Sequence, residues 1–279
     1  MESMVAASDT RRLDLVLEKL YRDGGYDFRD YKRGTITRRL SRRLYATGAG
    51  TYLEYLRFLD SHPEEYQRLA DDLTIKVSDF FRSRISFQQL AHLVLPELLS
   101  YKEAVGEKMI RFWSVACARG EEPYSIAILL DEFLGQRRYE FDISIQATDI
   151  SQWALSRAHT GEYCLTDLKG IPESVMQNCF TCIGEYYKVR ADIKQMVSFS
   201  HFNLASITRP PFTGLDCIFC CNVLIYWQKQ LQERVLGMLC DVLSSPGYLV
   251  LGEVESPTSN IRRRLVCLDS RAKIYKKVA

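Results

Sequence analysis

The sequence predicts an α/β protein: a doubly wound, mostly parallel sheet, with a small all-helical domain before it and a small β insertion within it. Three observations support this prediction. Residues 11–89 show helical apolar spacing and no convincing strand, strands and helices alternate from residue 110 onward, and the alternation is interrupted over residues 161–202. Because parallel strands are joined by helical crossovers, such alternation indicates a doubly wound sheet.

The composition is that of a globular protein and excludes several classes. The 279 residues are 47% hydrophobic and 26% charged, which excludes a disordered, collagen-like or coiled-coil chain. With 37 Lys and Arg against 35 Asp and Glu, the net charge is +2, so no global field attracts nucleic acid or a membrane. No segment resembles an export signal or is apolar enough to span a bilayer. We expect a cytoplasmic protein with reduced cysteines, no nucleic-acid partner and no membrane insertion.

The helical domain, with its linker, is placed at residues 1–89 and the sheet domain at residues 90–279. Glycine and proline pairs separate three short helical stretches in the first domain. Each stretch places three aliphatic residues on one helix face: Leu13, Leu17 and Leu20; Ile36, Leu40 and Leu44; Leu53, Leu56 and Leu59.

The sheet domain is predicted from buried apolar runs and the helices between them. The predicted strands are residues 110–115, 141–147, 216–221 and 248–251, and the predicted helices are residues 123–133, 151–158 and 229–243. Within residues 161–202, the alternating pairs Tyr187/Val189 and Val197/Phe199 predict the small β insertion.

Two Cys-x-x-Cys pairs, Cys179/Cys182 and Cys217/Cys220, have the spacing of zinc ligands. The second pair lies in a predicted buried strand, where side chains three residues apart point to opposite faces and cannot converge on one ion. We therefore expect small buried side chains and no metal.

The first predicted strand leads into a turn suited to a ligand. Residues 112–120 run from a buried strand through small residues to Gly120, and Glu121, Glu122 and Pro123 open the next helix. Small residues let a ligand approach the backbone, and this turn is the ligand crevice of a doubly wound sheet. A dinucleotide site would need GxGxxG and bare N–H groups, whereas two carboxylates here repel phosphate. A cationic nucleoside without phosphate, such as S-adenosylmethionine, suits the turn better.

Polar residues follow two further strands. Asp149 ends the second strand, where it could accept both ribose hydroxyls or cap the next helix; together with the first turn, the ribose role is favoured. Asn222 follows a buried strand, with Tyr226 and Trp227 beyond it. These three residues could be the end of a core strand covered by aromatic side chains. A polar Asn and a phenol among apolar neighbours instead favour a ligand-binding site.

Together these motifs resemble the CheR family of chemotaxis methyltransferases, which esterify receptor glutamates with S-adenosylmethionine. The resemblance implies a helical N-terminal domain, a Rossmann-like seven-stranded methyltransferase sheet and a β-subdomain. It covers nearly the whole chain, through Thr74-x-x-x-Ser78-Asp-Phe-Phe-Arg82, Trp113-Ser, Gly120-Glu-Glu-Pro-Tyr-Ser-Ile-Ala, Ala147-Thr-Asp-Ile-Ser, Asn203-Leu, Ile218-Phe-Cys-x-Asn-Val-Leu-Ile-Tyr and Gly247-Tyr-Leu.

The resemblance also implies roles for single residues. Glu122 would hold the cofactor ammonium, Asp149 its ribose, and Arg82 and Tyr226 would lie beside the transferring methyl group. No general base is needed, because a glutamate acceptor is already ionised near neutral pH. The implied cofactor contacts are Lys76, Ser78, Arg82, Glu122, Asp149, Asn203, Leu204, Cys221 and Asn222.

Several positions depart from the family pattern. Lys76 stands where the family has Asn, Cys221 where it has Arg, Arg119 where it has a small hydroxyl residue, and Glu253-Val-Glu255 where it has His-Ser-Glu. A catalytically impaired module that binds the cofactor or only a partner therefore stays open beside the active enzyme. A nucleic-acid methyltransferase is disfavoured, because the [DNS]PP[YFW] signature is missing.

A basic stretch in the helical domain is a candidate docking surface. At helical spacing, Arg38/Arg42 and Arg39/Arg43 form adjacent rows, which could also be a solvated face. The resemblance implies that this helix docks Glu-rich receptor methylation helices, with Arg39 the position most suggestive of contact. Some family members bind a receptor C-terminal peptide on the β-subdomain, but the short turn over residues 181–185 argues against such a tether here. We expect a monomer.

Overall fold

The computed structural model describes residues 2–74, 78–206 and 209–278. Its contacts divide the chain into two compact units. Unit 1 comprises Met1–Ile75 and Tyr226–Leu231, and unit 2 comprises Lys76–Ile225 and Gln232–Ala279. Each unit has its own buried apolar cluster. Among the described residues, no helix is both long enough and apolar enough to cross a bilayer.

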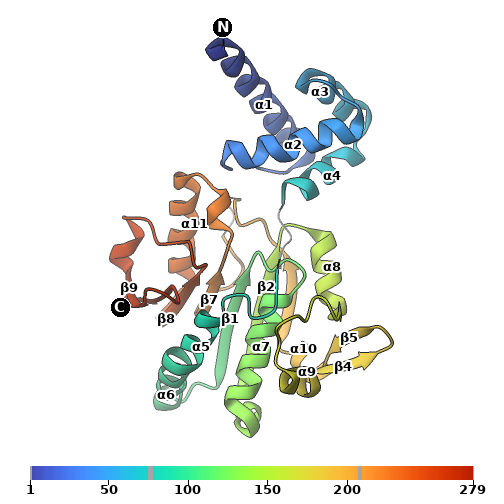
Figure 1. Cartoon of the computed structure of the whole chain (residues 1–279). Helices are drawn as coiled ribbons and strands as arrows, with labels where there is room; N and C mark the ends of the chain where they lie inside the picture. The colour runs from blue at the N-terminus through green and yellow to red at the C-terminus, as the bar shows by residue number, and fades with distance from the viewer. Residues whose placement is uncertain (1, 75–77, 207–208, 279) are drawn as a thin grey trace. The chain divides into compact units, whose positions relative to one another are not determined.

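Unit 1 contains four helices (Figure 1): α1 (Glu2–Gly24), α2 (Arg33–Thr47), α3 (Tyr52–Ser61) and α4 (Glu64–Leu73). The start of α3 is capped by Thr51, whose hydroxyl accepts the Glu54 N–H, while the Glu54 carboxylate accepts the Gly50 N–H. Such reciprocal capping satisfies backbone donors that the first turn leaves without partners.

The three predicted helical stripes contribute to the core of unit 1, with two differences. The stripe of α1 is buried as expected, and in α2 Ile36 and Leu40 are buried while Leu44 is partly buried against the same cluster. In α3, however, Leu59 and Tyr55 are the buried residues, and Leu53 is 45% exposed. Tyr55 takes the core position because its hydroxyl has a buried partner, donating to Glu65 Oε1 at 2.7 Å.

Unit 2 is built on a seven-stranded sheet in the order β6-β2-β1-β7-β8-β10-β9 (Figure 1). The strands from β6 to β8 are parallel, and β10 runs antiparallel to β8 and β9. The bounds are β1 (Met109–Val115), β2 (Asp142–Asp149), β6 (Val197–His201), β7 (Leu215–Cys220), β8 (Leu243–Leu251), β9 (Leu265–Asp269) and β10 (Ile274–Lys277).

Helices and short turns connect these strands. Helix α7 (Glu121–Leu134) packs against β1, β2 and β6 and lies in front of the sheet in the view of Figure 1. The other helical elements outside the β insertion are α5 (Arg84–Gln89), the π-helix η1 (Leu90–Val94), α6 (Leu95–Val105), η2 (Gly135–Glu140), α8 (Gln152–Thr160), η3 (Leu224–Tyr226), α11 (Lys229–Val242) and η4 (Ile261–Arg264).

The predicted boundary at residues 89/90 differs from the division by contacts, which falls at residues 75/76. Residues 84–89 were expected to close the first domain. Instead, Phe87 is buried in the core cluster of unit 2, together with Leu90 and Val94, which were placed in the second domain. Their helical periodicity could not reveal which of the two cores their apolar face joins.

The β insertion is a separate three-stranded antiparallel sheet, but it is shorter than expected. Its order is β3-β5-β4, with bounds β3 (Glu162–Cys164), β4 (Phe180–Ile183) and β5 (Tyr186–Val189). Helix α9 (Glu173–Cys179) lies between β3 and β4 in the chain, and α10 (Ala191–Lys194) follows β5. The assignment of Val197 and Phe199 to this insertion was wrong: both lie on β6, which pairs in parallel with β2 at the edge of the main sheet.

Candidate functional site

The loop after β1 is held in an unusual backbone conformation. The φ angles of Ala116, Ala118 and Gly120 are +54°, +48° and +93°. A Cβ on Gly120 would lie 3.0 Å from the Cβ of Ala158 and 3.1 Å from the hydroxyl of Tyr163, so only glycine fits without a shift. Left-handed conformations at alanine are strained and persist where the surroundings fix them, often at ligand sites. The loop is therefore a preformed structure.

Asp149, the last residue of β2, fixes this loop. Its Oδ2 accepts the N–H of Ala118 at 2.9 Å, and its Oδ1 accepts the N–H of Ser151 at 2.8 Å. The N-cap of α8 is Ser151, whose hydroxyl accepts the N–H of Ala154, so capping that helix is not the role of Asp149. Asp149 thus joins the end of β2 to the loop after β1 and to the start of α8.

Glu122, in the first turn of α7, is the second carboxylate at this edge of the sheet. Its Oε1 accepts a hydrogen bond of 2.7 Å from the hydroxyl of Ser114 on β1. Burial raises the pKa of Glu122 to about 7, against the lowering effects of Ser114, Cys221 and Arg82. A cationic ligand would stabilise the ionised form of this carboxylate.

The residues after β7 complete the carboxyl edge. Burial raises the pKa of the Cys221 thiol well above its usual value, so the thiol is protonated at neutral pH and donates to Glu122. Its Sγ also lies 3.8 Å from the carbonyl oxygen of Val250. Asn222 has a φ of +60°, a conformation that asparagine adopts more readily than most residues. At position 221 the site thus has a neutral donor where the family has an arginine.

Asn203 and Leu204 follow β6 at the same edge. The N–H of Phe202 donates to the carbonyl oxygen of Asp149 at 3.1 Å, which ties the end of β6 to the end of β2. The Asn203 amide oxygen accepts the N–H of Ala205 at 3.0 Å and so closes a turn. Asn203 is therefore the residue directly after the one that contacts Asp149.

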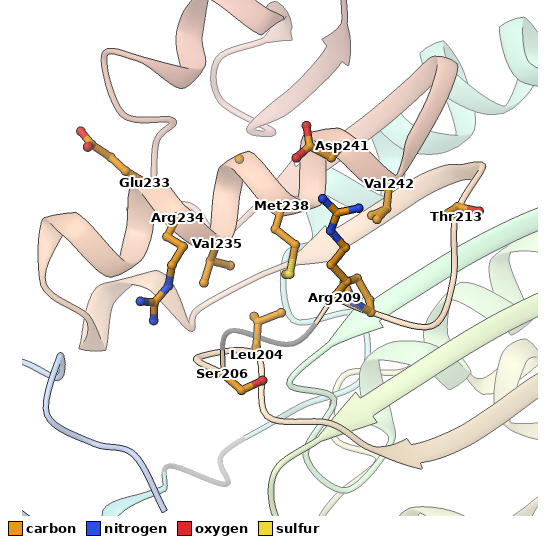
Figure 2. A pocket seen from close by; sticks show the side chains of 12 residues that line it. Leu204, Ser206, Arg209, Thr213, Glu233, Arg234, Val235, Met238, Asp241 and Val242 are labelled. Atoms are coloured by element: carbon orange, nitrogen blue, oxygen red, sulfur yellow. The ribbon is translucent and has the colours of Figure 1, made fainter. Parts of the chain in front are cut away.

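Leu204 lines a cavity of about 570 Å³ between this turn and α11. Figure 2 shows Val235 and Met238 pointing from α11 toward the segment that carries Leu204 and Arg209. The walls are apolar and the charged groups at the rim have both signs: Arg209, Glu233, Arg234 and Asp241. Of the predicted site residues that the structure describes, Leu204 is the one that lines this cavity.

Two of the predicted positions cannot be joined to this cluster. Lys76 lies outside the described residues. Tyr226 belongs to unit 1, where its carbonyl oxygen accepts the N–H of Lys32 at 2.8 Å and the next residue, Trp227, pairs with Tyr31. The pairing of Arg82 with Tyr226 therefore stays a prediction. Ser78 and Arg82 belong to unit 2, and the charge of Arg82 acts on Glu122.

Arg119 joins the loop to the β insertion. Its guanidinium lies 2.8 Å from Glu121 Oε1 and 3.1 Å from Asp167 Oδ1. Glu121 is fully buried, and burial raises its pKa to about 7 although Arg119 opposes the shift. Neither Glu121 oxygen has a well-aligned hydrogen bond from a described residue. Arg119, a departure from the family pattern, is thus the counter-ion of a buried carboxylate.

Arg119→Ser is expected to lower Tm by roughly 3–6 °C at pH 8 and by much less at pH 5. Glu121 has a raised pKa in the folded chain. Without Arg119 that pKa rises further, so ionisation at pH 8 costs more, whereas at pH 5 the group already carries its proton. Thermal unfolding at both pH values measures the difference. Arg137→Ser, at an exposed pair with Glu103, is the control, and equal losses at pH 5 and pH 8 would contradict the assignment.

The basic residues of α2 are largely engaged within unit 1. Arg43 pairs at 2.6 Å with Glu65, which is 1% exposed, and Arg42 pairs at 2.8 Å with Asp72. Arg39 donates to the carbonyl oxygens of Asp72 and Thr74 at 2.6 and 3.2 Å. Only Arg38 of these four lacks a hydrogen bond or ion pair among the residues that the structure describes. It is therefore the arginine of this row most available to a partner.

Sequence reasoning gave no role to three residues of these sites. Ser114 was noted only within the motif Trp113-Ser, and Glu255 only within Glu253-Val-Glu255. Glu65 gave no signal, because a buried Glu is recognised only from its tertiary partners. Glu255 accepts N–H groups from the loop after β7. It could have been suspected, because it follows a parallel strand on the carboxyl side where ligand crevices form.

Two family models match the chain. The model described as "CheR methyltransferase, all-alpha domain" matches residues 11–74, and "CheR methyltransferase, SAM binding domain" matches residues 76–273. The chain is 35% identical to chemotaxis protein methyltransferase 2 of Pseudomonas aeruginosa, over 86% of this chain and 85% of that protein. It is 30% identical to the chemotaxis protein methyltransferase of Borreliella burgdorferi, over 89% of each. An uncharacterized 104.1 kDa protein of Rhodobacter capsulatus is 35% identical over 88% of this chain, which covers a quarter of that longer protein.

Proposed function

The chain belongs to the CheR methyltransferase family, and from this premise we propose that it transfers a methyl group from S-adenosylmethionine to glutamate side chains of chemoreceptors. The product would be a glutamate methyl ester in chemotaxis-type signalling. One observation supports this most: the carboxylates of Glu122 and Asp149 flank a preformed glycine turn at the carboxyl edge of the sheet.

The residues present fit the cofactor. Glu122 has a raised pKa that an ammonium would bring down, and Asp149, at the same edge of the sheet, would accept the ribose hydroxyls. Cys221 offers a thiol donor, and Asn203 and Leu204 lie by the adenine in this proposal. When bound, S-adenosylmethionine supplies an electrophilic methyl group on a positively charged sulfur.

The residues of the chain would act by placement. Arg82 would hold the acceptor carboxylate by a bidentate contact, in line with the methyl group, and Tyr226 would donate a hydrogen bond to the same carboxylate. The apolar neighbours of Cys221 and Leu204 would exclude water from the displacement. No group needs to remove a proton, because the acceptor is already an anion at neutral pH.

A ligand series tests the cofactor site. We expect calorimetric titration to find S-adenosylmethionine and S-adenosylhomocysteine bound with similar stoichiometry, adenosine weaker because it lacks the ammonium, and 5′-AMP weakest because carboxylates repel its phosphate. Tight binding of 5′-AMP with no binding of S-adenosylmethionine would contradict the proposal.

Cys221 favours one alternative, a catalytically impaired module that binds the cofactor and regulates a partner. The thiol replaces an arginine expected in the family, which removes one positive charge beside two carboxylates. This alternative predicts stoichiometric cofactor binding without methyl transfer to any receptor fragment. The enzyme proposal predicts both, so one titration and one transfer assay on the same preparation separate them.

Arg38→Glu is expected to raise the KM for a receptor fragment about fivefold to tenfold at low salt, with kcat and Tm unchanged. Arg38 is exposed and has no hydrogen bond or ion pair with any described residue, so in the variant a Glu-rich receptor helix would meet a repulsive carboxylate there. Steady-state kinetics at low and high salt measure the effect, because salt screens exposed charges.

Arg43→Glu is the matched control, with the same change of charge on the same helix. It is expected to lower Tm instead, because it places a second carboxylate beside buried Glu65. An unchanged KM for Arg38→Glu would assign α2 to an ordinary solvated surface.

A further inference from the structure

The ends of β7 and β8 lie side by side at the carboxyl edge of the sheet. The two strands are parallel, with Cys220 paired to Leu251. The segments that follow them are therefore neighbours: the loop 221–225, which carries the predicted cofactor contacts Cys221 and Asn222, and the segment 252–255.

A single buried side chain of the second segment holds the loop 221–225 in place. Glu255 is 4% exposed, and its Oε2 accepts the N–H of Asn222 and the N–H of Gly252, both at 2.8 Å. Its Oε1 accepts the N–H of Ile225 at 3.2 Å. Because an ionised carboxylate only accepts hydrogen bonds, it matches a set of converging N–H donors that a neutral side chain could not match.

The surrounding backbone is shaped to this carboxylate. Asn222 has a φ of +60°, which costs energy and needs a partner to hold it. A Cβ on Gly252 would lie 2.7 Å from Glu255 Oε2 and 2.8 Å from the Asn222 nitrogen, so residue 252 must be glycine for the two segments to approach. The strained loop, Gly252 and the Glu255 carboxylate therefore depend on one another for their positions.

We propose that Glu255 is a positioning residue of the methyl-transfer site: its carboxylate fixes the loop 221–225, and so places Asn222 at the cofactor. The inference rests on the proposed function for its catalytic consequence, but its structural part stands on the contacts alone. Glu255 acts through the loop and has no contact with the acceptor in this proposal.

Glu255 and Glu122 also share one electrostatic environment. The charge of Glu255 contributes to the raised pKa of Glu122, so the two carboxylates lie close to each other. Four backbone N–H groups lower the pKa of Glu255 against a larger raising effect of burial. A cationic ligand at Glu122 would stabilise both anions, so the loop geometry and cofactor binding are coupled.

The test uses Glu255→Gln, which keeps the size of the side chain and replaces one acceptor by a donor. We expect hydrogen exchange in a peptide covering residues 221–226 to become about 10–100-fold faster, because one of the backbone N–H groups that donate to Glu255 loses its acceptor. With a receptor fragment we expect kcat to fall by a similar factor and the KM for receptor to stay within twofold. If Glu255→Gln does not fold, Glu255→Asp, which keeps the charge on a shorter stem, is expected to show the same pattern more weakly.

Asp216→Asn is the matched control. Asp216 is 2% exposed, accepts the Arg111 N–H at 2.8 Å and pairs with Lys102 at 2.8 Å, but it lies near the opposite end of β7. It is expected to lower Tm without changing exchange in residues 221–226 or kcat. Glu255 variants that change only Tm, like Asp216→Asn, would overturn the proposal. Exchange needs no cofactor, so a wild-type protein without methyl transfer would refute the proposed function and leave the exchange result readable.

Discussion

Arg82→Ala is expected to lower the rate of methyl transfer to a receptor fragment by about 10²–10³-fold. In the proposal, Arg82 holds the acceptor carboxylate in line with the methyl group. Without it the carboxylate is misaligned, and most of the rate gain from orienting the two reactants is lost. Arg82→Lys keeps the charge but not the bidentate contact, so we expect an intermediate loss.

Cofactor binding should respond to Arg82→Ala in a pH-dependent way. The charge of Arg82 lowers the pKa of Glu122, so its removal raises that pKa further above 7 and protonates Glu122 over more of the neutral range. The dissociation constant of S-adenosylmethionine should therefore rise at pH 6.5 and change little at pH 8.5. Arg84→Ala is the control, because that exposed arginine two residues away donates to the carbonyl of Gly170. Wild-type turnover in Arg82→Ala would remove Arg82 from its proposed role.

Glu122→Gln is expected to weaken binding of S-adenosylmethionine by about 10–100-fold, the loss of a charge-assisted hydrogen bond. In the wild type, affinity should increase from pH 6 to pH 8, because Glu122, with a pKa of about 7, accepts the ammonium only when it is ionised. Below pH 7, binding should also release protons. In Glu122→Gln this pH dependence should vanish.

Calorimetry in buffers of different ionisation enthalpy measures both effects. Glu132→Gln, near the C-terminal end of the same helix α7, is the control. It should keep the wild-type pH dependence of binding, because Glu132 lines a different pocket, together with Phe87 and Val175. A wild-type affinity that is flat between pH 6 and pH 8, or a Glu122→Gln variant with unchanged affinity, would contradict the role of Glu122.

Local signals in the sequence were sufficient for most of the fold. The small residues before Gly120 and the acids after it predicted a strand, a turn and a helix, and all three are present. The strand Val197–His201 was assigned to the wrong sheet, because alternation shows that a segment is extended but not which strand it pairs with. The first boundary differed for a similar reason: helical spacing around Phe87 does not specify the core that this residue enters.

The positions of site residues could be predicted where the residues lie on one continuous motif. Asp149 and Glu122 are such residues, and both lie at the carboxyl edge of the sheet as expected. The engagement of Arg43 by Glu65, and of the loop after β7 by Glu255, depends on partners about 20 and 30 residues away in sequence. Such pairs follow from tertiary packing, which charge patterns in one helix or strand do not reveal. The strain at Ala116 and Ala118 was equally hidden, because alanine gives no signal for a positive φ.

The central claim is that this crevice delivers a methyl group to receptor glutamates, and one measurement tests it most directly. The protein is incubated with S-adenosylmethionine labelled in its methyl group and a receptor cytoplasmic fragment, and the fragment is then treated with alkali. The account predicts label on the wild-type fragment that alkali releases as volatile methanol, and none when the acceptor glutamates are changed to alanine. A fragment without label, or one whose label survives alkali, would contradict it.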